Sequence, residues 1–199
     1  MIPFSPAYFS SFILNTTSWD PATLTTALIK KADELNRGEI DVTDPDISPF
    51  ARRGGKLLQY AGWSDPGIPA GDSIYYYSRV AEYLALNSTL NIDDHYRLWL
   101  VPGMAHCHSG KGANAFGGSA QAGQGMPAPC AASSHHILLA AVDWVEHGKT
   151  PSEIVATKWR DNDASKGEIE FQRRLCMYPL RSVYGGGDPA SADSFSCQA

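Results

Sequence analysis

The feature that most constrains the fold is a pair of short apolar runs separated by a helix-forming segment. Residues 56–60 and 96–101 are apolar runs of strand length, each followed by a loop rich in glycine or proline, which is typical of buried strands. Between them, residues 73–86 repeat apolar side chains at helical spacing. The inward face predicted for this helix consists of Ile74, Tyr77, Ala81 and Leu84. A strand–helix–strand succession predicts an α/β fold with a mostly parallel sheet, and we expect one domain over residues 1–199.

The flanking segments predict further elements of the same kind. Asp20 and Pro21 are typical of a helix start, as an N-cap carboxylate and a first-turn proline, and Gly38 is a plausible end. A second helix is expected from Ser133 or Ser134 to Gly148, with an apolar stripe of Leu138, Ala141, Val142 and Val145. Short strands are expected at residues 153–158 and 168–176, and a long irregular loop at residues 109–129.

Charge and hydropathy exclude two classes of partner. The chain has a net charge of −5 and no run rich in lysine or arginine, so we expect no nucleic-acid partner. No apolar run approaches the roughly 18 residues that a membrane helix needs, and we expect no membrane span. The apolar opening, residues 1–14, lacks a positively charged start and contains two prolines, which predicts folded chain and no signal peptide.

Two candidate catalytic side chains, an aspartate and a histidine, follow the two predicted strands. Asp65 lies in the loop after residues 56–60, and His106 lies in the loop after residues 96–101. Ligands of α/β sheets bind beyond the carboxyl ends of the strands. An α/β-hydrolase triad has the chain order serine, acid, histidine, and the acid fixes the tautomer of the histidine that moves the proton. The order and placement of Asp65 and His106 fit the last two members.

The amino-acid sequences of three segments resemble those of one enzyme family. Gly-Gly-Lys-Leu-Leu-Gln-Tyr-Ala-Gly-Trp-Ser-Asp-Pro-Gly-Ile-Pro at residues 54–69 is similar to the acid-bearing segment of the tannase/feruloyl esterase family. Val-Pro-Gly-Met-Ala-His-Cys at residues 101–107 resembles its histidine segment, and residues 141–151 fit a later one. The resemblance is clearest over residues 52–160 and specific because the segments occur in order.

This resemblance implies the C-terminal part of a secreted fungal ester hydrolase with an α/β-hydrolase fold. The substrates would be esters of phenolic acids such as gallate or ferulate. Asp65 would be the triad acid, and His106 the general base and then the general acid. Cys107 would match the cysteine that the family joins by a disulfide to a cysteine beside the nucleophile, a partner that this chain lacks. Cys176 and Cys197 would form a second disulfide that staples the tail, residues 161–199.

The nucleophile itself is missing from this sequence. No Gly-x-Ser-x-Gly motif occurs, and Ser119 lacks the glycine that the motif requires. The resemblance implies that the serine, the oxyanion hole and a lid with a calcium site lie upstream, so we expect no cofactor in this chain. The chain alone is expected to be inactive, and the N-terminal part of the same enzyme would be its partner.

Cysteines and sequons give weaker indications of secretion. The four cysteines allow three pairings, and residue reasoning alone does not choose among them. Cys130 has no partner even by resemblance. Asn15 and Asn87 stand in Asn-x-Thr/Ser sequons and are candidate glycosylation sites.

Two alternatives of other classes stay open. One is a non-catalytic domain that binds aromatic ligands, for which Trp63, beside the acid, is the best candidate for a pocket wall. The other is a zinc-binding module, whose ligands would come from the set His106, Cys107, His108, Cys130, His135 and His136. Their spacing matches no established zinc pattern, so no metal is predicted.

Overall fold

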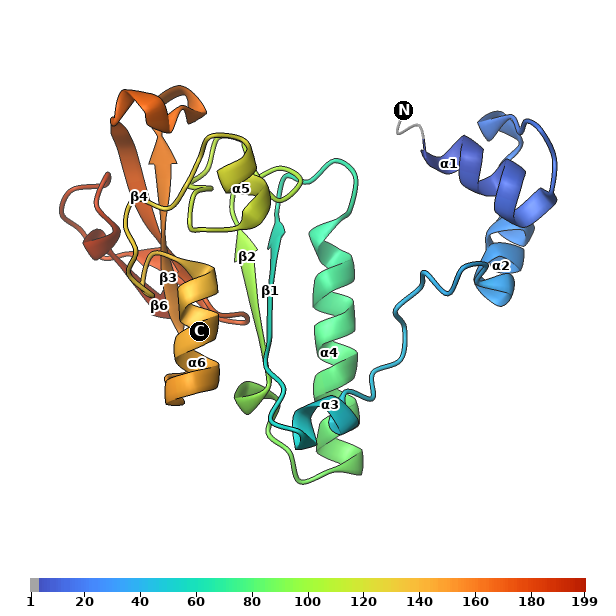
Figure 1. The fold of residues 1–199 in the computed structure, drawn as a ribbon, viewed down its shortest axis with the longest axis horizontal. Helices are drawn as coiled ribbons and strands as arrows, with labels where there is room; N and C mark the ends of the chain where they lie inside the picture. The colour runs from blue at the N-terminus through green and yellow to red at the C-terminus, as the bar shows by residue number, and fades with distance from the viewer. Residues whose placement is uncertain (1–3) are drawn as a thin grey trace. The chain divides into compact units, whose positions relative to one another are not determined.

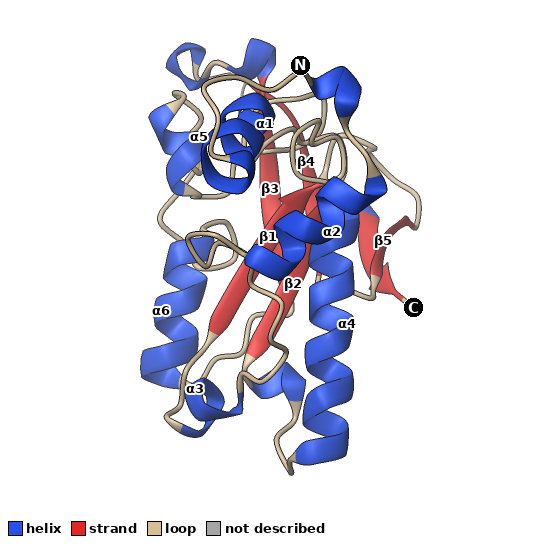
Figure 2. Ribbon diagram, turned by 90° about the vertical axis from the view of Figure 1, so that its right-hand side faces the viewer, coloured by secondary structure: helices blue, strands red, loops and turns tan. Residues whose placement is uncertain are grey.

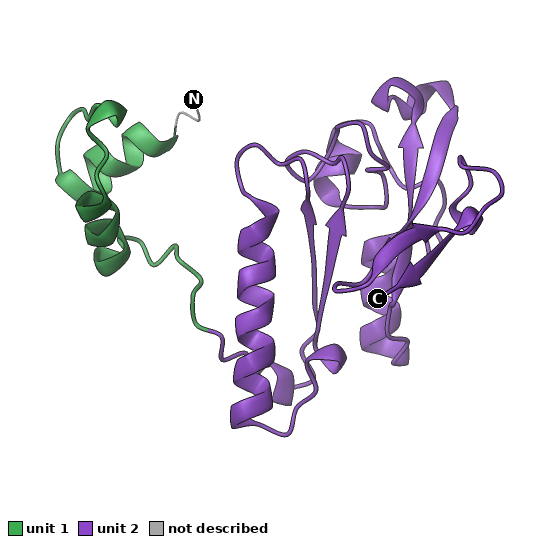
Figure 3. Ribbon diagram, turned by 180° about the vertical axis from the view of Figure 1, so that it is seen from behind, with its two compact units in different colours: residues 1–44 green, residues 45–199 purple. Residues whose placement is uncertain are grey.

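Figure 1 shows the computed structural model of the chain, which describes residues 4–199. These residues form two compact units, residues 1–44 and 45–199 (Figure 3). The prediction of one domain over residues 1–199 remains a prediction, and the two units are described separately. The first holds α1 (Phe4–Ala7), η1 (Tyr8–Leu14), η2 (Pro21–Thr23) and α2 (Thr26–Leu35).

The helix predicted to begin at Asp20 begins later. The Asp20 carboxylate accepts the N–H of Ala22 at 2.9 Å, but this caps only the short η2 turn. Leu24 then adopts an extended conformation, and Thr25 caps α2 by accepting the N–H of Leu28 at 3.2 Å. The predicted start was wrong because Thr25, five residues later, provides a second N-cap from which the longer helix begins.

The second unit contains the predicted strand–helix–strand succession. Its elements are α3 (Ser48–Arg52), β1 (Leu57–Gly62), α4 (Ala70–Asn87), η3 (Ile92–Asp94), β2 (Tyr96–Val101), α5 (Ser119–Gly123), α6 (Ile137–His147), β3 (Glu153–Trp159), η4 (Arg160–Asn162), η5 (Ala164–Lys166), β4 (Ile169–Cys176), β5 (Arg181–Tyr184), η6 (Ala192–Ser194) and β6 (Phe195–Gln198). β1 and β2 pair in parallel, from Leu57 opposite Tyr96 to Gly62 opposite Val101. The α/β fold class is therefore confirmed.

α4 covers one face of the β1–β2 pair and α6 lies on the other side (Figures 1 and 2). The α4 side of the core is a cluster of Tyr77, Val80, Leu84, Tyr96 and Leu98. Ile74 and Ala81, predicted to face inward, are half-buried. The helix begins at Ala70 after Pro69, three residues before the predicted start, so that Asp72 lies inside its first turn.

α6 buries a different stripe from the one predicted. Ile137, Ala140 and Trp144 face the core, whereas Leu138 is 62% and Val145 is 63% exposed. His136, not Ser133 or Ser134, takes the N-cap position. Both stripes have helical spacing, and the observed one places the large Trp144 ring inside.

Antiparallel hairpins follow α6. β3 pairs with β4, and β5 pairs with β6, so within residues 4–199 the parallel pairing is that of β1 with β2. Trp99 of β2 forms a bridge to Met177, which joins the end of β4 to the parallel pair. Cys176 and Cys197 form a disulfide, so the tail is tied down as the resemblance implied. The core on this side includes Trp99, Val101, Met104, Phe116, Ile154 and Leu175.

Candidate active site

Asp65 lies just past the end of β1, in a turn that its own side chain stabilises. One carboxylate oxygen, Oδ1, accepts the N–H of Gly67 at 2.7 Å and the N–H of Ile68 at 3.0 Å. Aspartate commonly stabilises a turn in this way. The side chain is only 5% exposed, so the second oxygen, Oδ2, has a fixed direction.

His106 lies past the end of β2 and meets that second oxygen. Its Nδ1 is 2.7 Å from Asp65 Oδ2, while the histidine side chain is 59% exposed. A carboxylate has no proton to donate, so Nδ1 is the donor in this pair. In the neutral ring this leaves Nε2 as an acceptor, which is the tautomer that a general base needs.

Backbone contacts join the two loops. The N–H of Trp63 donates to the Val101 carbonyl at 3.0 Å, and the N–H of Ser64 donates to the Met104 carbonyl at 3.0 Å. A Cβ at Gly62 would lie 2.3 Å from the carbonyl oxygens of Met104 and Ala105. Only glycine allows this approach, so the sequence of β1 itself brings the acid to the histidine.

The histidine loop is closed tightly at its base. Met104 forms a bridge to Gly110, and the N–H of Gly112 donates to the Gly103 carbonyl at 3.1 Å. A Cβ at Gly112 would lie 1.8 Å from the Pro102 carbonyl oxygen. The turn inside this closure has positive φ at Cys107 (63°), Ser109 (58°) and Gly110 (96°). Positive φ is strained for cysteine and serine, and such residues cluster at functional sites.

The environment of Asp65 favours its ionised form. Burial alone would raise the pKa of the carboxyl, but the N–H groups of Ile68 and Gly67 and the His106 ring outweigh it and hold the pKa below its usual range. A permanently ionised carboxylate can orient the imidazole and stabilise the imidazolium.

Cys107 and Cys130 are both free thiols in the structure. Cys107, next to His106, is partly buried. The pKa of its thiol is raised mainly by this burial and further by the negative charge of Asp65. Cys130 is exposed. The disulfide that the resemblance implies between Cys107 and an upstream cysteine stays a prediction.

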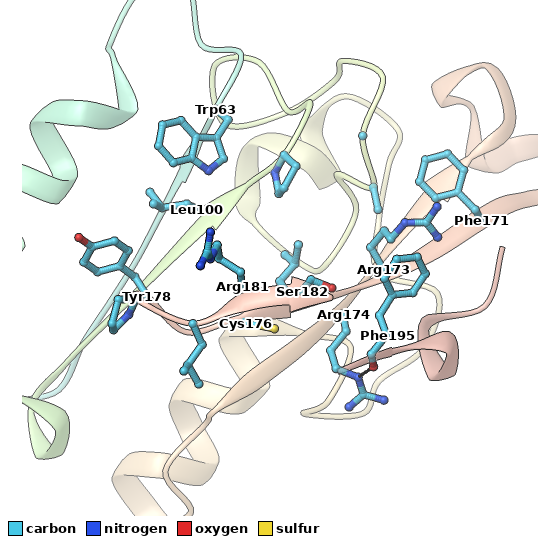
Figure 4. A pocket seen from close by; sticks show the side chains of 16 residues that line it. Trp63, Leu100, Phe171, Arg173, Arg174, Cys176, Tyr178, Arg181, Ser182 and Phe195 are labelled. Carbon is cyan, nitrogen blue, oxygen red and sulfur yellow. Dashed lines mark hydrogen bonds between the residues drawn. The ribbon is translucent and has the colours of Figure 1, made fainter. Parts of the chain in front are cut away.

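Trp63 lines a cavity of about 610 Å³ (Figure 4). Trp63 is 52% exposed. Other aromatic and cationic lining residues are Phe171, Arg173, Arg174, Tyr178, Arg181 and Phe195. Neither Asp65 nor His106 lines this cavity, so Trp63 faces a space beside the candidate site.

The zinc alternative finds no support in the structure. Across residues 4–199, no three histidine, cysteine, aspartate or glutamate side chains are grouped so that they could hold a metal ion. No helix in the same range has both the length and the hydropathy to cross a membrane. The sequon asparagines Asn15 and Asn87 are both exposed.

Sequence reasoning missed the residues that fix the geometry. The two N–H donors to Asp65 belong to Gly67 and Ile68. The sequence Asp-Pro-Gly, which is typical of a turn, could have indicated them. The close approach of Gly62 to the histidine loop had no local signal, because it depends on a contact between segments about 40 residues apart in the sequence.

Comparisons with known proteins identify the family of this chain. The family model described as tannase and feruloyl esterase matches residues 8–198. Feruloyl esterase B of Aspergillus niger is 36% identical over 193 residues, which are 96% of this chain and 35% of that protein. The chain thus spans about a third of the length of this relative.

Solved structures give the same result. The crystal structure of an esterase from Aspergillus oryzae matches with a TM-score of 0.86 at 31% identity, covering 96% of this chain and 36% of that one. The crystal structure of feruloyl esterase B from the same organism matches with a TM-score of 0.83 at 30% identity, with the same coverage. The chain belongs to the tannase and feruloyl esterase family, and its fold matches part of an α/β hydrolase.

Proposed function

We propose that this chain supplies the acid and the histidine of a serine carboxylic ester hydrolase whose nucleophile lies outside the sequence. The observation that carries the proposal is the 2.7 Å contact between His106 Nδ1 and Asp65 Oδ2. The buried carboxylate is held by two N–H groups, and the exposed ring leaves Nε2 open to a third group. This is the arrangement that acyl transfer to water needs.

In the proposed reaction, His106 Nε2 takes the proton of a serine hydroxyl as the serine oxygen attacks the ester carbonyl. The imidazolium, paired with Asp65, then gives that proton to the leaving alcohol, and the ester C–O bond breaks to form an acyl-enzyme. A water molecule attacks the acyl-enzyme with His106 again as base. The carboxylic acid is released and the serine is regenerated.

The phenolic acyl group is part of the same proposal. Relatives of this chain are named feruloyl esterase B, and we infer phenolic esters as substrates on that basis. Cys107 would be bridged to a cysteine beside the serine, which would hold nucleophile and base together. Secretion and glycosylation at Asn15 and Asn87 belong to the same proposal and are supported by the disulfide and the exposure of both asparagines.

The decisive experiment supplies the missing part. We expect the chain alone to hydrolyse methyl ferulate and methyl gallate no faster than its His106→Ala variant. Co-expression with the N-terminal portion of a family esterase should restore hydrolysis. His106→Ala should then reduce the rate by about 10⁴-fold, as the loss of a triad member typically does.

His147→Ala is the matched control, because His147 also pairs through Nδ1 with an aspartate, Asp143, at 3.1 Å and is similarly exposed. It should leave the restored activity unchanged. Equal losses in both variants, or a restored activity that His106→Ala does not reduce, would contradict the proposal.

A second candidate function is a non-catalytic domain that binds aromatic ligands. The aromatic cavity beside Trp63 favours it. If the complemented protein does not hydrolyse esters but binds ferulate, and Trp63→Ala removes the binding, this second function is the correct one.

A further inference from the structure

A buried ammonium group lies beneath the histidine loop. Lys158 is the sixth residue of β3 and is only 6% exposed. Its Nζ donates a 2.6 Å hydrogen bond to the carbonyl oxygen of Gly110 and a second to Asn162 Oδ1. Both partners are neutral oxygens, one from the histidine loop and one from η4.

This arrangement is costly for a residue with only a packing role. Burial lowers the pKa of Lys158, although the negative charges of Glu170 and Asp161 act against this. The ion pairs formed within residues 4–199 do not include it. Burying an ammonium without a carboxylate partner is unfavourable unless its hydrogen bonds are needed.

The acceptor of Lys158 closes the turn that carries His106. Gly110 forms the bridge to Met104 and is the last of the positive-φ residues in this turn. Asn114, which is fully buried, adds a weaker contact from its Nδ2 to the same carbonyl at 3.4 Å and donates to Asn162 Oδ1 at 3.1 Å. Lys158, Asn114 and Asn162 thus form one polar cluster around the Gly110 carbonyl.

A strained turn persists only where its surroundings hold it in place. Two strained residues lie just after the catalytic candidate: Cys107 follows His106 directly, and Ser109 is three residues beyond it. The N–H of Ala105 donates to the Ser109 carbonyl across the turn at 3.3 Å, the outer limit of a backbone hydrogen bond. His108 Nδ1 lies 2.7 Å from Ser109 Oγ, but this contact joins neighbouring residues within the turn. The 2.6 Å bond from Lys158 Nζ to the Gly110 carbonyl instead ties the turn to β3.

We infer that Lys158 is a positioning residue for His106, holding the strained turn through the Gly110 carbonyl so that the imidazole stays on Asp65. The expected effect of Lys158 on ester hydrolysis rests on the proposed function. Its expected effect on the His106–Asp65 contact does not. Lys158 touches no reacting atom, so it acts only through the loop.

The first test uses the 199-residue chain and needs no ester hydrolysis. The proton between His106 Nδ1 and Asp65 is observed by ¹H–¹⁵N NMR in the wild type, in Lys158→Met and in Lys149→Met. Lys149 is an exposed surface lysine that serves as the control. We expect Lys158→Met to shift or lose this signal while the amide signals of β1 and α4 remain, and Lys149→Met to retain it. An unchanged His106 signal in Lys158→Met, with only a lower melting temperature, would overturn the inference.

Asn162→Ala provides a second variant if Lys158→Met does not fold. It leaves the lysine in place but removes one of its two acceptors, so the His106 signal should shift in the same direction by a smaller amount. A wild-type signal in Asn162→Ala would then overturn the inference.

The second test uses the complemented enzyme. Lys158→Met should lower kcat by about 10- to 100-fold with KM unchanged, because a small displacement of a catalytic group acts on the chemical step. Equal changes in kcat for Lys158→Met and Lys149→Met would overturn the positioning role. If complementation yields no hydrolysis at all, the proposed function fails, and the NMR test still decides the role of Lys158.

Discussion

The main-chain N–H of Ser64 donates to the carbonyl of Met104 at 3.0 Å, one residue before the acid and two residues before the histidine. The Asp65–His106 contact therefore does not depend on two independent loops reaching toward each other. The loops are parts of one hydrogen-bonded framework that extends past the ends of β1 and β2. The side-chain contact at 2.7 Å is a consequence of that framework.

The framework predicts a strong effect of a single methyl group. In Gly62→Ala, the new Cβ would meet the carbonyl oxygens of Met104 and Ala105 at 2.3 Å, and one of the loops must move. We expect a loss of stability of about 1–3 kcal/mol and loss of the His106–Asp65 proton signal, measured by urea unfolding and NMR.

Gly71→Ala is the matched control, because its Cβ would meet nothing within 4 Å and the position is helical. It should stabilise the chain by about 0.5–1 kcal/mol, since alanine favours a helix more than glycine does. A Gly62→Ala variant with unchanged stability and an unchanged proton signal would show that the framework does not set the geometry.

The lowered pKa of Asp65 predicts that the free energy of unfolding depends on pH. Its pKa is lowered in the folded chain, with burial outweighed by the Ile68 and Gly67 N–H groups and by His106, and the unfolded value is about 3.9. The ionised carboxylate therefore stabilises the fold fully above pH about 4, and this contribution is lost as the pH falls through the folded pKa. Asp65→Asn should lower the unfolding free energy by about 1–3 kcal/mol at pH 7.

The difference between wild type and Asp65→Asn should shrink in urea titrations below pH about 4. A difference that is the same at pH 7 and pH 3 would mean that shape, and not charge, accounts for the effect of the substitution.

The sequence predicted those parts of the fold that depend on local pattern. β2 was predicted with its observed bounds, and β1 within about two residues, because apolar runs next to glycine and proline are local signals. The succession of acid and histidine past the two strands followed from the same pattern. The topology therefore predicts that the two side chains lie at the same edge of the sheet, but not the contacts that fix their geometry.

The parts that sequence reasoning missed depend on contacts between distant segments. α6 has two apolar stripes, and only the tertiary packing of Trp144 decides which one is buried. Lys158 looks like a surface lysine in a strand until β3 is placed beneath Gly110. The antiparallel pairing of β3 with β4 likewise has no signature in either strand taken alone.

The disulfide predicts a measurable stabilisation of the tail. Cys176 and Cys197 are 21 residues apart, and closing a loop of this size in the unfolded chain contributes about 3 kcal/mol. The double variant Cys176→Ala/Cys197→Ala should lose that amount in urea unfolding, with its largest gain in hydrogen exchange in β5 and β6. Cys130→Ala, which removes an exposed free thiol, is the control and should change stability by less than about 0.5 kcal/mol. Equal stabilities of the double variant and the control would contradict a structural role for the bridge.

The two free thiols should differ in reactivity, and the difference tests how Cys107 is held. Thiolates are the reacting species in alkylation, and both burial and the charge of Asp65 raise the pKa of Cys107. Cys130 is exposed. Iodoacetamide at pH 7 should therefore modify Cys130 first, and mass spectrometry of tryptic peptides distinguishes the two sites. Asp65→Asn removes the negative charge, so it should accelerate the modification of Cys107 but not of Cys130. Modification of Cys107 before Cys130 in the folded chain would mean that the loop bearing His106 is more open than the structure shows.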